Sequence, residues 1–461
     1  MYLTRYSIFC ILTVMLSVLK TTAQTDTIKV MTYNVLNYGD LCQGSNSILH
    51  SYLKTIVEYA KPDLLGLVKM SSIKQNSSDI GAFSPYGFAD SIINNALNPG
   101  TSKPFSYCHF TNISGDSKTA VLFYNSSKLG YISTTTLSSN VSDFDLYKLF
   151  YKDSNLTSTK DTTFLFVILN HTQSGSDATI RNQQEAAVLT GIKQRFYHLP
   201  NLIIMGDFNI HNSSEQFYQN YTASSDNNFL LYDPPFSIDN ALTYPANWDA
   251  NPYSFAPYLT TSTRQSATYP NSCGTDGGAK SWYDHILLSP WLKNNDNYIS
   301  YLPNSYSTIG NDGNRIGISI NDSTTSGIGK NNSAPGTVIN ALFQLSNKYP
   351  VSLKLLVNQN TSGQSLPDPE KSVLGDWESQ FDVTIQNPVI DQLNLKFSPA
   401  LLNDFGSMAD FILRNTEGKV VWQTSAKLKD ELIFELPDLS KGIYLIHISI
   451  GGMLYHLKLI L

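Results

Sequence analysis

The chain has 461 residues and a net charge of −6, with 15% charged and 12% aromatic side chains. This length exceeds the usual size of a single hydrophobic core, so we expect two or three domains. Few charges and many Ser, Thr and Asn residues are typical of a secreted, strand-rich protein. The acidic balance excludes a general electrostatic attraction to DNA or RNA, and we expect no stable nucleic-acid complex.

Residues 1–23 have the pattern of a signal peptide. Arg5 forms a short basic region, Ile8 to Leu19 is apolar, and residues 21–23 are small enough for cleavage. The apolar stretch is too short to span a membrane, and no later segment is long enough either. Cleavage also removes Lys20, which takes the net charge from −6 to about −8.

From Thr27 to about Val357, apolar strand-like segments alternate with helical patterns. Strands are expected at Ile28–Val35, Thr119–Tyr124, Thr163–Asn170, Leu202–Met205, His285–Leu288 and Val351–Val357. Helices are expected at Ile48–Tyr59 and Ile180–Phe196. This mixture predicts an α/β domain over residues 24–357 with mainly antiparallel strands.

The remainder of the chain differs in character. Residues 358–378 are polar, aperiodic and rich in Pro and Gly, which predicts a linker. Residues 379–461 show alternating patterns typical of a small all-β sandwich domain. Its expected strands include Lys419–Gln423, Leu432–Leu436 and Gly442–Ile450.

Three short motifs occur in order within this last domain. They are Asn-Pro-Val-Ile-Asp-Gln-Leu at 387–393, Asn-Thr-Glu-Gly-Lys-Val-Val at 415–421 and Leu-Ser-Lys-Gly-Ile-Tyr-Leu at 439–445. Together they resemble the sorting domain of the type IX secretion system. The resemblance implies the type IX machinery as a partner, export through the periplasm and outer membrane, and a secreted or cell-surface location. The alternative is an ordinary β-sandwich module such as a carbohydrate binder.

Three cysteines remain after signal cleavage, namely Cys42, Cys108 and Cys273. One disulfide with one free thiol is permitted, and the sequence leaves the pairing open. No Cys-x-x-Cys pair or Cys/His metal spacing is present.

The most informative stretch for function is Leu202 to Asn209, where an apolar run ends in Gly-Asp-Phe-Asn. Side chains alternate along a strand, so Asp207 and Asn209 are expected on the same side of its end. A carboxylate and an amide placed in this way suit a hydrated divalent cation or a phosphate oxygen. On its own, the pair is more often a plain strand-to-turn transition.

Further motifs surround this one along the chain. In order they are Met-Thr-Tyr-Asn-Val at 31–35, Pro-Asp-Leu-Leu-Gly-Leu-Val-Lys at 62–69, Ala-Val-Leu-Phe-Tyr at 120–124, Leu-Asn-His at 169–171, Arg-Asn-Gln-Gln-Glu-Ala at 181–186, Tyr-Asp-His-Ile-Leu-Leu-Ser at 283–289 and Ser-Asn-Lys-Tyr-Pro-Val at 346–351. Their order resembles the endonuclease/exonuclease/phosphatase superfamily. The resemblance implies a DNase I-like, four-layer α-β-β-α sandwich and metal-assisted hydrolysis of a phosphoester.

The resemblance assigns roles to five residues of this chain. Asn34 corresponds to a position near metal and phosphate, and His171 to a phosphate-contacting histidine. Asp207 and Asn209 correspond to the Asp-x-Asn pair, and Asp284 to the aspartate that braces the catalytic histidine. A structural interpretation competes at each position, because Asn and His residues also terminate strands.

Three positions depart from the family pattern. Lys69 stands where the metal-binding Glu is expected, and Asn347 and Lys348 stand where an Asp-His pair is expected. An ammonium cannot ligate Mg²⁺ and repels it. Lysine is also a poor base near neutral pH unless its pKa is strongly perturbed. His285 follows Asp284 and offers another Asp-His pair, but adjacent strand residues face opposite sides.

These departures leave three functions open. The first is a secreted pseudoenzyme that binds a phosphate ester or other anion through Lys69, Lys348, His171 and Asn34, with no metal or cofactor. The second is an active nuclease or phosphodiesterase that uses Mg²⁺ or Mn²⁺. The third is a surface scaffold or interaction protein. For the first function, we expect Lys69 or Lys348 within ion-pairing reach of Asp207 or Asp284.

Overall fold

A computed structural model describes residues 25–71, 85–99, 103–139, 142–159 and 162–358, apart from 269 and 272. It also describes 370, 377–380, 383–386, 389, 392–397, 408–416, 418–450 and 453–461. The described residues form two compact units, which divide at residue 370. The expected signal peptide at 1–23 and most of the expected linker at 358–378 lie outside the described residues.

The first unit contains a seven-stranded sheet in which β10, β12, β1, β2, β4 and β3 are neighbours in that order and β11 pairs with β12. Its strands are β1 (Thr25–Tyr38), β2 (Leu64–Ser71), β3 (Phe105–Tyr107), β4 (Lys118–Asn125), β10 (Ile299–Tyr301), β11 (Ser307–Thr308) and β12 (Val351–Asn358). Only the β1–β2 pair is parallel among the described strands of this sheet.

A second sheet of five strands has the order β5-β6-β7-β8-β9. Its strands are β5 (Leu129–Ser138), β6 (Phe144–Tyr151), β7 (Phe164–His171), β8 (Leu202–Asp207) and β9 (Asp284–Leu288). The β7–β8 pair is parallel, and the other described pairs are antiparallel. The mainly antiparallel α/β unit expected from the sequence is therefore confirmed.

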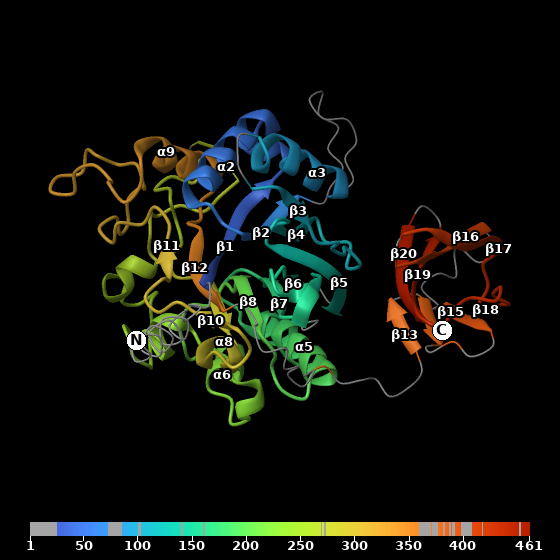
Figure 1. Cartoon of the computed structure of the whole chain (residues 1–461). Helices are drawn as coiled ribbons and strands as arrows, with labels where there is room; N and C mark the ends of the chain where they lie inside the picture. The colour runs from blue at the N-terminus through green and yellow to red at the C-terminus, as the bar shows by residue number, and fades with distance from the viewer. Residues whose placement is uncertain are drawn as a thin grey trace, which may run out of the picture. The chain divides into compact units, whose positions relative to one another are not determined.

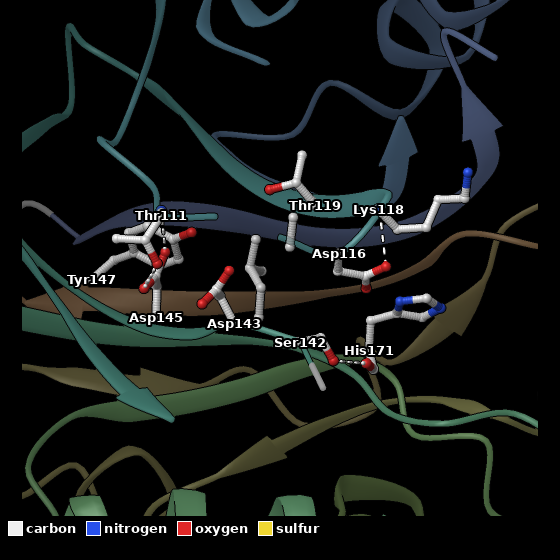
Figure 2. A pocket seen from close by; sticks show the side chains of 11 residues that line it. Thr111, Asp116, Lys118, Thr119, Ser142, Asp143, Asp145, Tyr147 and His171 are labelled. Carbon is white, nitrogen blue, oxygen red and sulfur yellow. Dashed lines mark hydrogen bonds between the residues drawn. The ribbon is translucent and has the colours of Figure 1, made fainter. Parts of the chain in front are cut away.

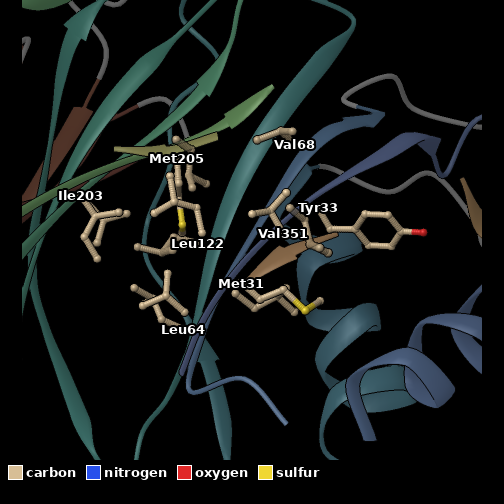
Figure 3. Packing of buried hydrophobic residues seen from close by; sticks show 14 of the residues in the cluster. Met31, Tyr33, Leu64, Val68, Leu122, Ile203, Met205 and Val351 are labelled. Atoms are coloured by element: carbon tan, nitrogen blue, oxygen red, sulfur yellow. The ribbon is translucent and has the colours of Figure 1, made fainter. Parts of the chain in front are cut away.

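The two sheets face each other across a hydrophobic layer. Leu64 and Leu122 from the first sheet point toward Ile203 and Met205 from the second, as Figure 3 shows. All four side chains are fully buried, and such burial is the main favourable contribution to folding. Gly66 lies in the same layer, where a Cβ atom would meet Leu169 Cδ2 at 2.4 Å.

Helices cover the outer faces of this pair of sheets (Figure 1). On the side of the seven-stranded sheet lie α2 (Asn46–Ala60), α3 (Pro85–Ile92), the π-helical turn η2 (Ile93–Leu97) and α9 (Gly336–Leu345). On the side of the five-stranded sheet lie α5 (Thr179–Arg195) and α6 (Gln216–Thr222). The predicted four-layer α-β-β-α sandwich is confirmed.

Short helical segments complete the connections of this unit. They are η1 (Leu41–Gln43), α4 (Leu156–Thr159), η3 (Asn227–Phe229), α7 (Pro234–Ser237), η4 (Pro252–Tyr258) and α8 (Pro290–Asn294). No helix among the described residues is both long and apolar enough to cross a membrane.

The second unit is the small all-β sandwich that the sequence predicts. One sheet has the order β13-β14-β15-β18, the other has the order β17-β16-β19-β20, and the described pairs are antiparallel. The strands are β13 (Trp377–Gln380), β14 (Val383–Gln386), β15 (Leu393–Phe397), β16 (Met408–Asn415), β17 (Val420–Lys427), β18 (Glu431–Phe434), β19 (Ile443–Ile450) and β20 (Met453–Ile460). Leu395, Phe411 and Ile446 belong to its single core.

The cysteine pairing that the sequence left open is a disulfide between Cys42 and Cys273. It links η1, just after β1, to the loop before β9. Cys108 is a buried free thiol.

Gly206 allows β7 and β8 to approach each other near the C-terminal end of β8. Its φ is +144°, and a Cβ atom there would lie 1.9 Å from the backbone oxygen of Asn170. We predict that Gly206→Ala lowers the free energy of unfolding by more than about 3 kcal/mol, because backbone atoms must move to remove the clash.

Urea unfolding of the purified chain measures this change. Gly115→Ala is the matched control, since Gly115 has φ +67° but no atom within 4 Å of the added Cβ. It should cost only about 1–2 kcal/mol. Equal losses of unfolding free energy in the two variants would show that the positive φ, rather than the close approach of the strands, is the reason why Gly206 cannot be replaced.

Candidate functional site

The predicted residues meet where β7, β8 and β9 end. His171 is the register partner of Asp207 across β7–β8, and Asp207 is the register partner of Asp284 across β8–β9. Ile203, Met205 and Asp207 alternate onto the face of β8 that packs against the other sheet. The site is therefore the polar end of the hydrophobic layer between the sheets.

Asp207 is the centre of the hydrogen-bond network. Its Oδ2 accepts a hydrogen bond from Asn34 Nδ2 at 2.8 Å and lies 3.1 Å from Lys348 Nζ. Its Oδ1 accepts a hydrogen bond from the backbone N–H of Asn209 at 3.0 Å. The side chain is only 2% exposed, so this is a buried ion pair. The ion pair expected between a lysine and a site carboxylate is confirmed.

Asn34 and Asn209 hold this arrangement from two sides. Asn34 Oδ1 accepts a hydrogen bond from Leu36 N, and Asn209 Nδ2 donates to Thr172 O. Asn209 adopts φ +49°, a conformation that Asn tolerates better than most residues. The amides of both residues are thus committed within the protein.

The two carboxyl groups differ sharply in their protonation. Burial alone would raise the pKa of Asp207, but Lys348, His171 and the hydrogen bonds of the carboxylate outweigh it and lower the pKa to about 2. Burial raises the pKa of Asp284 well above its usual range, and the Asp207 carboxylate raises it further. Lys348, Thr260 and Lys69 oppose this rise. The surroundings therefore favour the charged form of Asp207 and the neutral form of Asp284.

Lys69 lies on a β-bulge between β2 and β4, with φ +61°. Positive φ is costly for a long side chain and is often retained at functional sites. Burial lowers the pKa of Lys69, and the nearby Lys348 lowers it further. Within the described part of the chain, its ammonium has no hydrogen bond or ion pair.

His171 is partly exposed at the end of β7 and lines a small pocket with Lys118, Asp116 and Asp143. Figure 2 shows His171 and Lys118 at the same end of this pocket. Burial lowers the pKa of His171 to about 4, and the nearby lysines oppose its protonation. His171 is thus a neutral imidazole at neutral pH.

Asn347 is turned toward the disulfide-linked loop. Its Nδ2 lies 2.5 Å from Thr275 Oγ1, and a Cβ atom on Gly274 would come within 3.0 Å of its Cβ. The Cys42–Cys273 disulfide and a hydrogen bond from Asn271 Nδ2 to Gln43 Oε1 fix this loop beside the cleft. Asn347 therefore has a structural partner at the position where the family pattern has Asp.

His285 points away from the cleft, as strand alternation predicts. Its Nδ1 lies 2.9 Å from Asp233 Oδ2, and its ring stacks on Trp282 at 4.5 Å between centroids. It cannot form a catalytic pair with Asp284 from this buried position.

Several contributors carry no motif in the sequence. Tyr283 places its ring centre 4.5 Å from Lys348 Nζ, and Thr260 Oγ1 accepts from the backbone N–H of Asp284. Ser346 Oγ donates to Asn34 O and accepts from Lys348 N, which ties β1 to the lysine. The Asp-x-Asn motif does not predict these residues, because each contributes through contacts with residues that are distant in the sequence.

The donor set does not fit the divalent cation that the family chemistry uses. Asp207 and Asp284 are the two carboxyl groups that the described ends of β8 and β9 bring together, and Lys348 Nζ lies 3.1 Å from Oδ2 of Asp207. No group of three or more His, Cys, Asp or Glu side chains in the described ranges is placed to hold a metal. Two ammoniums at this point would repel a divalent cation.

Comparison with known proteins identifies the C-terminal part. Residues 387–461 match the family described as Secretion system C-terminal sorting domain. The sorting domain expected from the motifs is confirmed, and the chain is exported by type IX secretion to the cell surface or the extracellular space. No curated protein sequence matches the chain.

Solved structures of the endonuclease/exonuclease/phosphatase family resemble the chain at low identity. One from Beutenbergia cavernae is 11% identical, covering 94% of this chain and 99% of that chain at a TM-score of 0.40. One from Bacteroides thetaiotaomicron is 14% identical, covering 73% and 100% at 0.42. A mannosyl-6-phosphatase from Bacteroides thetaiotaomicron is 14% identical, covering 71% and 99% at 0.41.

The buried ion pair makes a prediction about stability. We expect Lys348→Met to lower the free energy of unfolding at pH 7 by about 3–5 kcal/mol, because it leaves the Asp207 charge buried without its partner. The double variant Asp207→Asn/Lys348→Met should lose much less unfolding free energy than the sum of the losses in the two single variants. Urea unfolding measures all four proteins.

The pH dependence has a definite sign. In the wild type, Asp207 has a folded pKa of about 2, below its unfolded value, so its contribution is present above about pH 4 and is lost as pH falls toward 2. In Lys348→Met the folded pKa should instead lie above the unfolded value. The variant should therefore approach the wild type in stability as pH falls from 7 to 4. A constant difference over this range would contradict a buried ion pair.

The sorting domain makes a prediction about export. Deleting residues 380–461 should prevent delivery to the surface or medium, while a chain of residues 24–357 should remain soluble and unfold cooperatively. Cell fractionation of the native host with an antibody to the first unit measures delivery. Normal export of the truncated chain would remove the sorting role.

Proposed function

We propose that the cleft around Lys69 is an anion-binding site for a phosphate ester or a similar acid group, and that it has lost the metal-assisted hydrolysis of its family. The observation that carries this proposal is the 3.1 Å contact between Lys348 Nζ and Asp207 Oδ2. A lysine ammonium thus already contacts Oδ2 of the aspartate that a cation would need.

The charges of the cleft favour an anion. Lys348 offsets Asp207, and Lys118 lies 3.3 Å from Asp40. The pKa of Asp284 is raised well above its usual range, which favours its neutral form, and His171 is neutral near pH 7 because its pKa is lowered to about 4. Of Lys69, Lys118 and Lys348, Lys69 is then the one whose ammonium has no ion pair with a described residue. A bound anion would offset it, and charge-assisted hydrogen bonds are the strong ones.

The contacts also show which of the four expected anion-binding residues could touch a bound anion directly. Asn34 donates its amide hydrogen bond to Asp207, and Lys348 forms its ion pair with the same carboxylate. Both residues therefore affect a bound anion through Asp207 rather than by direct contact. Lys69 and the neutral ring of His171 are the groups free to face it. A protein that served only as a surface scaffold would need neither Lys69 nor His171 in the cleft.

Isothermal titration with inorganic phosphate at pH 6.5 tests binding. Wild type should bind one phosphate per chain, and Lys69→Gln should weaken binding about tenfold or more, as expected for loss of a charge-assisted hydrogen bond. Lys280→Gln is the matched control, because Lys280 is exposed. Equal phosphate affinity in wild type and Lys69→Gln would contradict the proposed site.

The proposal also predicts a pH dependence. Asp284 is neutral below its raised pKa and becomes an anion above it. Its ionisation adds a negative charge beside Asp207 and reduces the net positive charge of the cleft. Phosphate affinity should therefore fall as pH rises through this pKa, and Asp284→Asn should remove that fall. Titrations at several pH values in matched ionic strength measure it.

Restoring the family residues should restore its chemistry. The triple change Lys69→Glu, Asn347→Asp and Lys348→His removes two ammoniums and supplies two carboxylates and an imidazole. Wild type should hydrolyse bis-p-nitrophenyl phosphate at background rates with Mg²⁺ or Mn²⁺, and the triple variant should gain weak, metal-dependent turnover. Robust, chelator-sensitive hydrolysis by the wild type would favour an active phosphodiesterase instead.

A further inference from the structure

We propose a second binding site, separate from the cleft, that recognises a carboxylate-bearing sugar chain. It is a groove of about 650 Å³, and its lining includes the loop between β10 and β11 together with Lys29 and Lys354. We call it the Lys29–Lys354 groove. Its size is in the range of pockets that hold ligands of several ring units.

Two like charges lie side by side in the lining of the groove. Lys29 in β1 and Lys354 in β12 are direct register partners in an antiparallel pair. Like charges at directly opposed positions destabilise a sheet unless a counter-charge lies between them. Neither ammonium has a hydrogen bond or ion pair among the described residues, and no Asp or Glu of the described chain lines the groove.

The nearest carboxylate is already committed to other groups. Asp63 is buried and accepts hydrogen bonds from Lys103 Nζ at 2.8 Å, Asn125 Nδ2 at 3.0 Å and the backbone N–H of Lys29 at 3.0 Å. Its charge is therefore divided among several donors. Burial lowers the pKa of Lys29, and Lys354 lowers it further, so a bound anion would relieve both costs.

The walls suit a sugar rather than a bare ion. They carry hydroxyl and amide groups on Asn304, Ser305, Ser307 and Ser333. Tyr59 from α2 is 42% exposed and anchors its hydroxyl on Ser333 O at 3.2 Å. Its ring offers an apolar face for the C–H groups of a pyranose.

The groove is physically distinct from the cleft. Lys29 alternates with Val30 along β1, so it shares a face with Met31 and Tyr33, whereas Asn34 points to the other face. The two residues are also separated by five strand positions, or roughly 16 Å along the strand. The groove therefore stands independently of the proposed function of the cleft.

Titration of the full secreted chain with a galacturonate trimer tests this inference. Wild type should bind it, Lys29→Gln and Lys354→Gln should each weaken binding about tenfold, and a neutral galactose trimer should not bind. Lys280→Gln and Lys69→Gln should bind as the wild type does, which separates this site from the cleft.

Tyr59→Ala tests the recognition of the sugar ring. It should weaken binding of the trimer at least threefold and leave any binding of inorganic sulfate unchanged. Unchanged trimer affinity in Lys29→Gln/Lys354→Gln would overturn the site. Equal affinity for inorganic sulfate and the trimer would overturn the assignment to a sugar.

Discussion

The ion pair between Lys348 and Asp207 is the interaction on which the functional end of this protein depends. A buried carboxylate needs a counter-charge, and here a lysine supplies it at 3.1 Å. Asn34, Asn209 and Ser346 then take positions that satisfy the pair. Oδ2 of Asp207, the oxygen that a metal ion would need, therefore already has its partners within the protein. The lysine of the cleft that remains without an ion pair among the described residues is Lys69.

The fold explains why these groups meet. Two sheets pack through apolar side chains, and the same strand alternation that buries Met205 carries Asp207 to the end of that layer. His171 and Asp284 arrive beside it because β7 and β9 are the neighbours of β8. The low-dielectric surroundings then shift the pKa values of the two carboxyl groups in opposite directions, lower for Asp207 and higher for Asp284.

Much of this could be predicted from the sequence, because long apolar runs and motif order specify β1, β7, β8, β9 and β12. The strand Leu129–Ser138 carries no such signal, since it is a largely polar, threonine-rich strand with mixed exposure. The side chain of Asn347 turns to Thr275, a contact set by a loop that a long-range disulfide fixes. Contacts such as Tyr283 over Lys348 also depend on tertiary packing and leave no local pattern.

The two lysines of the cleft serve different purposes in this account. Lys348 is part of the buried structure, and Lys69 is held on a bulge with its charge unused by the described protein. In this arrangement Asn34 and Asn209 support the ion pair through their hydrogen bonds to the Asp207 carboxylate. The C-terminal sorting domain places this cleft outside the cell.

The most direct test of the central claim is a calorimetric titration of the wild-type chain with Mn²⁺ at neutral pH, beside the Lys348→His variant. If Lys348 occupies the cation position on Asp207, the wild type should show no heat of binding at millimolar Mn²⁺, and the variant should bind more tightly. One Mn²⁺ bound per wild-type chain, and lost in Asp207→Asn, would contradict the account.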